Sequence, residues 1–229
     1  MIGIIGAMDI EVENIKALLS DITTERVSGI DFVKGKFSQK DVVVAKCGVG
    51  KVFSALCTEA MILKYNPKVI INVGVAGCLT PELKIGDIVI ADKVVQHDMD
   101  TSPLGDPIGM LSDINIVHIP TDKDVTALLE ESVKSAGFDF RTGTIASGDQ
   151  FIADKEKKDF IKSNFGAISC EMEGGSIGHV CYVNGVDFCV VRAISDSANG
   201  EASVDYPEFM KMAAENSIRV IKKFLAECE

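Results

Sequence analysis

The sequence predicts an α/β fold whose sheet is at least partly parallel. Short apolar runs that are typical of strands alternate with segments of helical period, which is the pattern of this fold class. With 229 residues, 47% of them hydrophobic, the chain can bury a substantial core. No linker or low-complexity tract interrupts it, so we expect a single domain over residues 1–229.

The first expected elements are a strand and a helix. Residues 1–6, MIGIIG, are apolar and predict a strand. Residues 10–19 follow with Val12, Ile15 and Leu18 on one face, which predicts a helix. Asp9 is the candidate N-cap, because its carboxylate can accept hydrogen bonds from unpaired N–H groups of the first turn.

Strands and helices continue to alternate along the rest of the chain. Strands are expected at residues 41–47, 69–75, 87–91, 143–147, 167–170 and 187–194. Helices are expected at residues 51–65, 123–136, 155–163, 174–183 and 206–227. Residues 98–117 are the least patterned, with several Gly and Pro turns, and a long irregular loop of this kind is often a lid or binding loop.

Charge and hydropathy argue against two classes of partner. A net charge of −11 and a pI near 4.8 argue against nucleic acid, because phosphate contacts need clustered Lys and Arg. The apolar runs are far shorter than the roughly 20 residues that span a bilayer. The N-terminus also lacks the basic region of a signal peptide, so we expect a cytoplasmic protein without membrane contact.

Cysteines and histidines are not spaced as metal ligands. The seven cysteines form no CxxC pair and most lie in apolar contexts, which predicts reduced, buried thiols. His97, His118 and His179 are scattered, so each is interpreted as a core or surface residue rather than a ligand. We therefore expect no metal and no cofactor.

Polar and Gly-rich turns follow several of the expected strands. Glu11 lies in GAMDIEVE after the first strand, Asp196 lies in RAISDSANG after the last, and GVAGCL, SGDQFI and CEMEGG follow others. Ligands of open α/β sheets bind beyond the carboxyl ends of strands. Each turn alone is better explained as a loop with helix caps, but together they favour a binding site.

The CEMEGG turn places Glu171 and Glu173 on either side of Met172 in a mostly apolar region. Glu is favourable in the first turn of a helix, where the dipole and unpaired N–H groups attract negative charge. A binding role is the alternative, and the residues alone leave both interpretations open.

Seven motifs resemble those of one known family. They are GAMDIEVE, CGVGKV, NVGVAGCL, IGDIVIAD, SGDQFI, CEMEGG and RAISD. Their order and separation resemble the 5′-methylthioadenosine/S-adenosylhomocysteine nucleosidases of the nucleoside phosphorylase superfamily, from Met1 nearly to the C-terminus. The resemblance implies a three-layer α/β/α domain with a central mixed, mostly parallel sheet. It also implies hydrolysis of the N-glycosidic bond of these two nucleosides to release adenine, with 5′-deoxyadenosine as a further candidate substrate.

By this resemblance, three carboxylates are catalytic. Asp196 would give a proton or hydrogen bond to purine N7 as the general acid, oriented by Arg192 and Ser195. Glu11 would hold and deprotonate the attacking water, while Glu173 would bind the ribose hydroxyls and stabilise positive charge on the sugar. Carboxylates in different environments suit such roles, as they do in O-glycosidases.

The resemblance also assigns substrate contacts. Phe151 would stack on adenine, Ile152 would offer backbone hydrogen bonds to its Watson–Crick edge, and Gly77 would allow close approach of the chain. Met172 and Met8 would lie against the sugar, and Tyr206 would close the ribose end. From the residue alone, Phe151 is better explained as core packing, and the intact SGDQFI motif favours the slot. Met8 is equally core filler, and a hydrophobic staple is the alternative for Tyr206.

Two residues depart from the family pattern and bear on the shape of the 5′ pocket. Val75 stands where many relatives have Ser or Thr, and Leu104 where they have an aromatic residue. The family's segment around Leu104 reaches the alkylthio pocket of a neighbouring subunit, which implies a homodimer with residues 98–112 near the neighbouring active site. The preference between the two nucleosides stays open.

Three rival functions use the same fold. A nucleoside phosphorylase would need arginines near the first Gly-rich loop, where this chain instead has Glu11, and a carboxylate there repels phosphate. A hydrolase of another purine nucleoside, such as futalosine or its 6-amino analogue, would use the same three carboxylates. A non-catalytic nucleoside-binding protein is disfavoured because none of the three carboxylates is missing.

Overall fold

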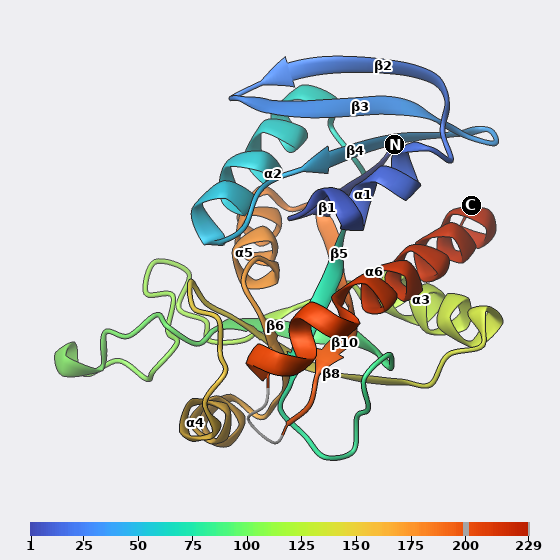
Figure 1. The fold of residues 1–229 in the computed structure, drawn as a ribbon. Helices are drawn as coiled ribbons and strands as arrows, with labels where there is room; N and C mark the ends of the chain where they lie inside the picture. The colour runs from blue at the N-terminus through green and yellow to red at the C-terminus, as the bar shows by residue number, and fades with distance from the viewer. Residues whose placement is uncertain (199–201, 229) are drawn as a thin grey trace.

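A mixed ten-stranded sheet organises the chain, which a computed structural model describes over residues 1–198 and 202–228 (Figure 1). The strands are β1 (Ile2–Gly6), β2 (Ser20–Val27), β3 (Ile30–Phe37), β4 (Lys40–Lys46), β5 (Val69–Cys78), β6 (Ile88–Gln96), β7 (Ile119–Pro120), β8 (Phe140–Ser147), β9 (Ala167–Glu171) and β10 (Asp187–Asp196). The helices are α1 (Asp9–Lys16), α2 (Lys51–Tyr65), η1 (Ser102–Leu104), α3 (Lys123–Ala136), α4 (Lys155–Phe165), α5 (Gly174–Asn184) and α6 (Ala202–Glu227).

The strand order brings distant segments together at one site. The path runs β10-β6-β8-β9-β5-β1-β4-β3-β2, and β7 adds to β6. Strand β10 also pairs with β5, in parallel, so β5, β9, β8, β6 and β10 form a closed ring. Strands β1, β5 and β10 run parallel side by side, and their carboxyl ends therefore meet at one edge.

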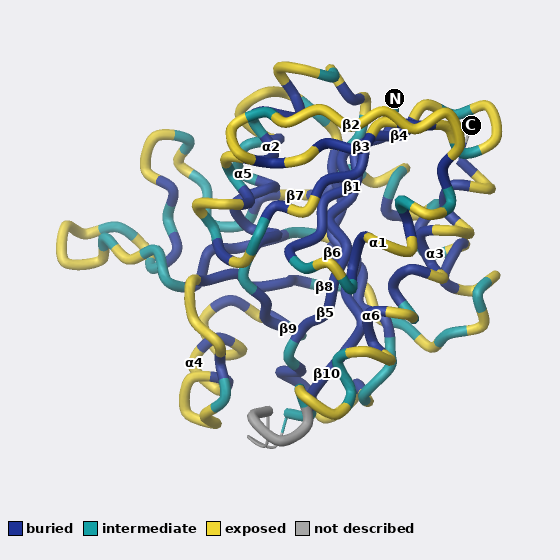
Figure 2. The backbone as a smooth tube through the Cα atoms, turned by 45° about the horizontal axis from the view of Figure 1, so that its top comes forward, coloured by how far each residue is buried: buried dark blue, intermediate teal, exposed yellow. Residues whose placement is uncertain are grey.

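Helices cover both faces of the sheet, and the predicted α/β class with a central sheet is confirmed. Helices α1, α3 and α6 pack on one face through a core that includes Ile15, Leu129 and Ile221. Helices α2 and α5 pack on the other face through Met61 and Ile177. Figure 2 shows the buried backbone concentrated along the strands between these two helical layers.

Helix ends follow ordinary capping chemistry, with one correction to the sequence analysis. The Asp122 and Asp154 side chains accept N–H groups in the first turns of α3 and α4, at 2.8 and 2.9 Å. Asp9 is not the N-cap of α1: the helix begins at Asp9, and Met8 is the N-cap. The N–H group of Met8, the N-cap, donates to the carboxylate of Glu11 at 2.9 Å. A glutamate of the first turn therefore caps the helix start instead of Asp9.

Several element boundaries also differ from the prediction. Helix α1 ends at Lys16 rather than at residue 19, while β5, β6, β8 and β10 are longer than expected. The sequence analysis missed β2 and β3, which pair with each other at the edge of the sheet. Residues 98–117 are mainly irregular, as expected, apart from η1 and one isolated bridge.

Candidate active site

An open pocket lies where the strand ends converge. Its walls come from the turns after β1, β8 and β9 and from the last residues of β5 and β10, as expected for ligand sites of α/β sheets. Every site residue expected from the sequence lines it except Arg192. The lining residues are Ala7, Met8, Glu11, Val49, Val75, Ala76, Gly77, Gln150, Phe151, Ile152, Cys170, Glu171, Met172, Glu173, Ser195, Asp196 and Tyr206.

Glu11 is buried at the start of α1 and is held by backbone N–H groups. One carboxylate oxygen accepts hydrogen bonds from Ala7 (2.7 Å) and Met8 (2.9 Å), and the other from Val75 (3.2 Å). Burial raises the pKa of Glu11, although the Arg192 guanidinium and these N–H groups oppose the shift. A fixed carboxylate with a raised pKa suits a general base that works near neutral pH.

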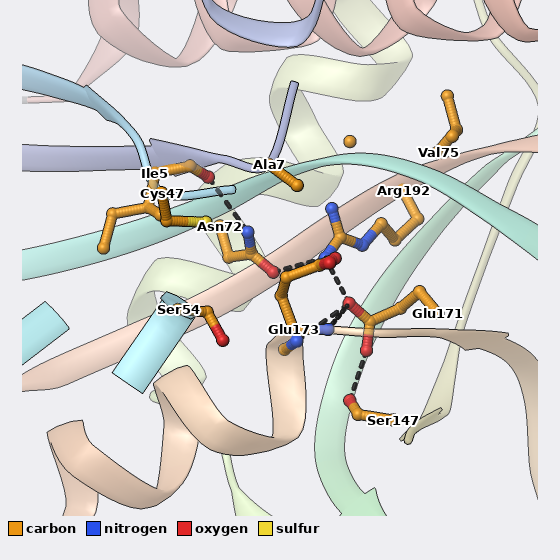
Figure 3. Close-up of polar contacts among 12 residues, drawn as sticks. Ile5, Ala7, Cys47, Ser54, Asn72, Val75, Ser147, Glu171, Glu173 and Arg192 are labelled. Carbon is orange, nitrogen blue, oxygen red and sulfur yellow. Dashed lines mark hydrogen bonds and ion pairs between the residues drawn. The ribbon is translucent and has the colours of Figure 1, made fainter. Parts of the chain in front are cut away.

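Glu171 and Glu173 have different environments, which resolves the ambiguity of the CEMEGG turn (Figure 3). Glu171 bonds to the Ser147 hydroxyl, to Arg192 and to the N–H groups of Glu173 (3.0 Å) and Gly174 (2.8 Å). Its oxygens are thus committed to the protein, at the amino end of α5. Glu171 therefore matches the interpretation of a helix-start carboxylate.

Glu173 has fewer partners and faces the pocket. One oxygen accepts the Gly50 N–H at 2.9 Å, and the other lies 3.4 Å from Arg192 Nη2. Burial and the negative charge of Glu171 raise the pKa of Glu173 to about 7, against the opposing effect of Arg192. This carboxylate is therefore available to bind polar groups of a ligand.

Arg192 has a different role from the expected one. Its buried guanidinium bonds to Asn72 (2.5 Å) and Glu171 and contacts Glu173, as Figure 3 shows. The expectation that Arg192 orients Asp196 is therefore wrong: within the described residues, its ion pairs join the two glutamates. Arg192 lies in β10, in the same strand as Asp196 but before it. Its positive charge balances the negative charges of the two glutamates beneath the pocket.

Asp196 ends β10 at the other side of the pocket, where Ser195 and Lys158 bond to its carboxylate. Ser195 Oγ lies 3.3 Å from Asp196 Oδ1, consistent with the expected support from Ser195. Lys158 Nζ donates to Asp196 Oδ2 at 3.0 Å, and this pair is almost fully buried. The acid is thus fixed in place by an ion pair that the sequence analysis did not find.

Two glycines of β5 make room for these groups. A Cβ on Gly74 would lie 2.1 Å from Arg192 Nη1 and 2.5 Å from Glu11 Oε1. A Cβ on Gly77 would lie 3.2 Å from Asp196 Oδ1, tighter than an ordinary contact. The sequence analysis proposed Gly77 for close approach of a ligand, and the structure shows that both glycines make space for charged side chains.

An apolar slot completes the pocket. The rings of Phe151 and Tyr206 meet edge to face with centroids 5.3 Å apart, and the Tyr206 hydroxyl lies 3.6 Å from Met8 Sδ. Phe151 is about half exposed, and Tyr206 lies within α6. These positions fit a pocket wall better than core packing or a helix staple.

The sequence analysis missed Lys158, Asn72 and Gly74. Lys158 carried a usable signal, because it lies at helical spacing from Ile161 and Phe165, on the buried face of α4. A lysine on an apolar face needs a buried partner. Asn72 and Gly74 carried no such signal, since their roles depend on Arg192 reaching them from β10.

Other expectations concern thiols, metals and membranes. All seven cysteines are buried and unbridged, as predicted. Within residues 1–198 and 202–228, His, Cys, Asp and Glu form no cluster suited to a metal ion. No helix in the described part of the chain has the length and hydropathy to cross a bilayer.

The chain belongs to the phosphorylase superfamily, whose sequence model matches residues 1–226. It is 36% identical over 226 residues to a 5′-methylthioadenosine/S-adenosylhomocysteine nucleosidase of Marinomonas sp., covering 98% of both chains. It is 38% identical to the aminodeoxyfutalosine nucleosidase of Helicobacter pylori, covering 99% of this chain and 98% of the relative.

A solved structure shows the same fold. It is a mutant of the Helicobacter pylori 5′-methylthioadenosine/S-adenosylhomocysteine nucleosidase, with 5′-methylthioadenosine in its active site. The two structures share a TM-score of 0.94 at 37% identity, over 99% of this chain and 98% of the other.

Proposed function

We propose that this protein is a purine nucleosidase that hydrolyses the N-glycosidic bond of 5′-methylthioadenosine and S-adenosylhomocysteine. One observation carries the proposal: Glu11, Glu173 and Asp196 surround a single pocket beside an apolar slot. The curated relative with 36% identity has this activity in its name. The products are adenine and the 5-thio-substituted ribose, and we propose methionine salvage as the process that uses them.

The three carboxylates divide the reaction between them. Asp196 gives a proton to N7 while the C1′–N9 bond breaks and its electron pair goes to the purine. Glu173 binds the 2′- and 3′-hydroxyls and stabilises positive charge on the sugar. Glu11 takes a proton from the water whose oxygen attacks C1′, so that one water molecule is consumed for each adenine released.

The apolar slot provides the adenine site. Phe151 stacks on the base, and the backbone of Ile152 hydrogen-bonds to its edge, while Met8, Met172 and Tyr206 enclose the sugar. The edge-to-face contact between Phe151 and Tyr206 supports this arrangement, because it connects the base wall with the sugar wall. Such a site suits a flat, weakly polar base.

A second substrate class is the 6-amino analogue of futalosine. The 38% identity to an aminodeoxyfutalosine nucleosidase favours it specifically. The same three carboxylates would cleave its adenine, since only the group at the 5′ position differs. One active site could therefore accept both substrates.

A panel of nucleosides assayed for free base, with and without phosphate, tests the proposal. It should include 5′-methylthioadenosine, S-adenosylhomocysteine, aminodeoxyfutalosine and 5′-deoxyadenosine. We expect adenine from the first two at rates that do not depend on phosphate. Release from aminodeoxyfutalosine alone would favour the second candidate, and binding without release would indicate a non-catalytic protein.

We further propose a cytoplasmic homodimer of single-domain subunits. Helix α2 exposes four large apolar side chains, and Leu104 in the projecting loop is a fifth, which supports an interface. The four are Val52, Phe53, Leu56 and Leu63. This loop and α2 lie on the same side of the molecule in Figures 1 and 2. Val49, which precedes α2, lines the pocket, so a partner on this face would approach the site. Light scattering at micromolar concentration should give twice the mass of the chain, and a monomer would contradict the proposal.

A further inference from the structure

Lys158 is an unusual residue for its place in α4. It lies on the buried face with Ile161 and Phe165, and only 2% of its surface is exposed. The other lysines of the helix, Lys155, Lys157 and Lys162, are exposed. A buried ammonium group is costly unless it is paired and hydrogen-bonded, so its partners indicate why it is there.

Lys158 bonds to the last residue of β10 and to the residue that follows it. Its Nζ donates to Asp196 Oδ2 at 3.0 Å and to the Ser197 carbonyl oxygen at 2.6 Å. These bonds fix the carboxylate and the turn that follows it from one side. Helix α4 also begins three residues after Ile152, which lines the pocket. One segment of the chain therefore contains both a residue of the proposed base slot and the lysine that bonds to Asp196.

Lys158 is the cation that pairs with Asp196 among the described residues, while Glu11 and Glu173 line the same pocket. Cys78, Cys170 and Tyr206 also interact electrostatically with Asp196, and burial is the first cause that raises the pKa of each. They are therefore uncharged near neutral pH. Among these described neighbours, Lys158 is the cation, at ion-pair distance.

We propose that Lys158 is a positioning residue that sets both the orientation and the acid strength of Asp196. This inference rests on the proposed function. When the carboxyl proton of Asp196 passes to purine N7, the carboxylate that is left is stabilised by the Lys158 ammonium, which keeps its own protons. Asp196 thereby becomes a stronger acid than a buried carboxyl without a cation would be.

The central test is the pH dependence of Lys158→Met, which removes the charge and keeps a chain of similar length. The reaction needs protonated Asp196, so kcat/KM falls as pH rises through the pKa of Asp196. Loss of the cation should raise this pKa and move the alkaline limb upward by about 1–3 pH units. The limiting kcat at lower pH should fall about tenfold, because a weaker acid transfers its proton less readily.

Three variants separate this role from a structural one. Lys158→Arg should restore the alkaline limb of the wild type, and the exposed neighbour Lys155→Met should leave the profile unchanged. In an Asp196→Asn background, Lys158→Met should cause no further loss of kcat, because the acid is already absent. Lys158→Gln replaces Lys158→Met if that variant does not fold, with the same expected shift of the limb.

The outcomes are distinct. An alkaline limb that coincides with that of the wild type, or a Lys158→Met loss that multiplies with Asp196→Asn, would overturn the role of Lys158. If the wild-type protein releases no purine from any nucleoside, the proposed function fails instead. Thermal unfolding of each variant identifies losses of kcat that come only from instability.

Discussion

At the scale of single residues, the two glutamates of the CEMEGG turn show how environment separates identical side chains. Glu171 is saturated by Arg192, Ser147 and backbone N–H groups. Glu173 keeps capacity for a ligand at the pocket wall. Their spacing in the sequence could not distinguish them, because the chain turns from β9 into α5 between them.

Glu173→Gln should therefore lose catalysis while Glu171→Gln mainly loses stability. We expect kcat/KM of Glu173→Gln to fall about 100-fold or more, the range of one electrostatic stabiliser. Glu171→Gln leaves the buried Arg192 charge less compensated, which costs about 3–5 kcal/mol of unfolding free energy. Steady-state kinetics and chemical denaturation check the pair, and equal kinetic losses at equal stability would contradict the assignment.

Asp196 and Glu11 should fail in different ways. Asp196→Asn keeps the shape but cannot transfer a proton, so kcat should fall by about 10² to 10⁴-fold. The loss should be smaller for a nucleoside whose base leaves without protonation. Glu11→Gln should be slow with both substrates, because its defect lies on the side of the attacking water.

Kinetics of both variants on 5′-methylthioadenosine and on an activated nucleoside make the comparison. Binding of an adenosine analogue is the control, because neither substitution removes Phe151, Ile152 or Glu173 from the pocket. If the activated substrate rescued Glu11→Gln but not Asp196→Asn, the two roles would have to be exchanged.

At the scale of elements, the sequence predicted the parts of the sheet that carry the site better than its edge. Strands β1, β5 and β10 are apolar and buried, so their pattern was clear. Strand β2, SDITTERV, is polar and exposed along almost its whole length, so it lacks the apolar alternation of a half-buried strand. Strand β2 pairs with β3 in a local hairpin, because Val27 lies opposite Ile30 and the two residues between them, Ser28 and Gly29, both have positive φ. The Ser-Gly dipeptide is a local turn signal that the prediction did not use.

Site residues that belong to a sequence motif could be predicted. Site residues whose partners are set by tertiary packing could not. Glu11, Glu173 and Asp196 belong to recognisable motifs at or just after the ends of strands. The predicted partner of Arg192, Asp196, was wrong. Glu171 and Glu173 reach Arg192 only because β9 and β10 belong to one sheet, which no local pattern shows. Lys158 depended in the same way on α4 packing against the end of β10.

Substitution of Gly74 in β5 tests whether the charged side chains packed against this strand leave no room for a methyl group. In Gly74→Ala the new methyl group would overlap Arg192 Nη1 and Glu11 Oε1, so the charged cluster must move. We expect kcat/KM to fall at least about 100-fold, since misplacement by about 1 Å can cost that much. Gly143→Ala in β8 is the matched control, because its methyl group meets the end of the Ile168 side chain. Similar activity of the two variants would contradict the account of Gly74.

At the scale of the whole molecule, buried carboxylates make stability depend on pH. Burial raises the pKa of Glu11, and raises that of Glu173 to about 7. The folded protein therefore binds protons more tightly than the unfolded chain, and the stability that this contributes is lost as pH rises through these folded pKa values.

The unfolding free energy should accordingly fall between about pH 5 and pH 8. Glu173→Gln cannot titrate, so its curve should be flatter in this interval. Denaturant titrations of both proteins at several pH values check the expectation, with Glu208→Gln, an exposed glutamate, as the control. A curve for Glu173→Gln parallel to that of the wild type would show that Glu173 does not titrate there.

The most direct test of the central claim is the identity of the sugar product when 5′-methylthioadenosine is cleaved with and without phosphate. Glu11 lines the pocket, and in the proposed reaction it activates water, whereas a carboxylate there would repel phosphate. We predict that adenine forms at the same rate in both conditions and that the sugar is always free 5-methylthioribose. A rate that rises with phosphate, with 5-methylthioribose 1-phosphate as the product, would contradict the account.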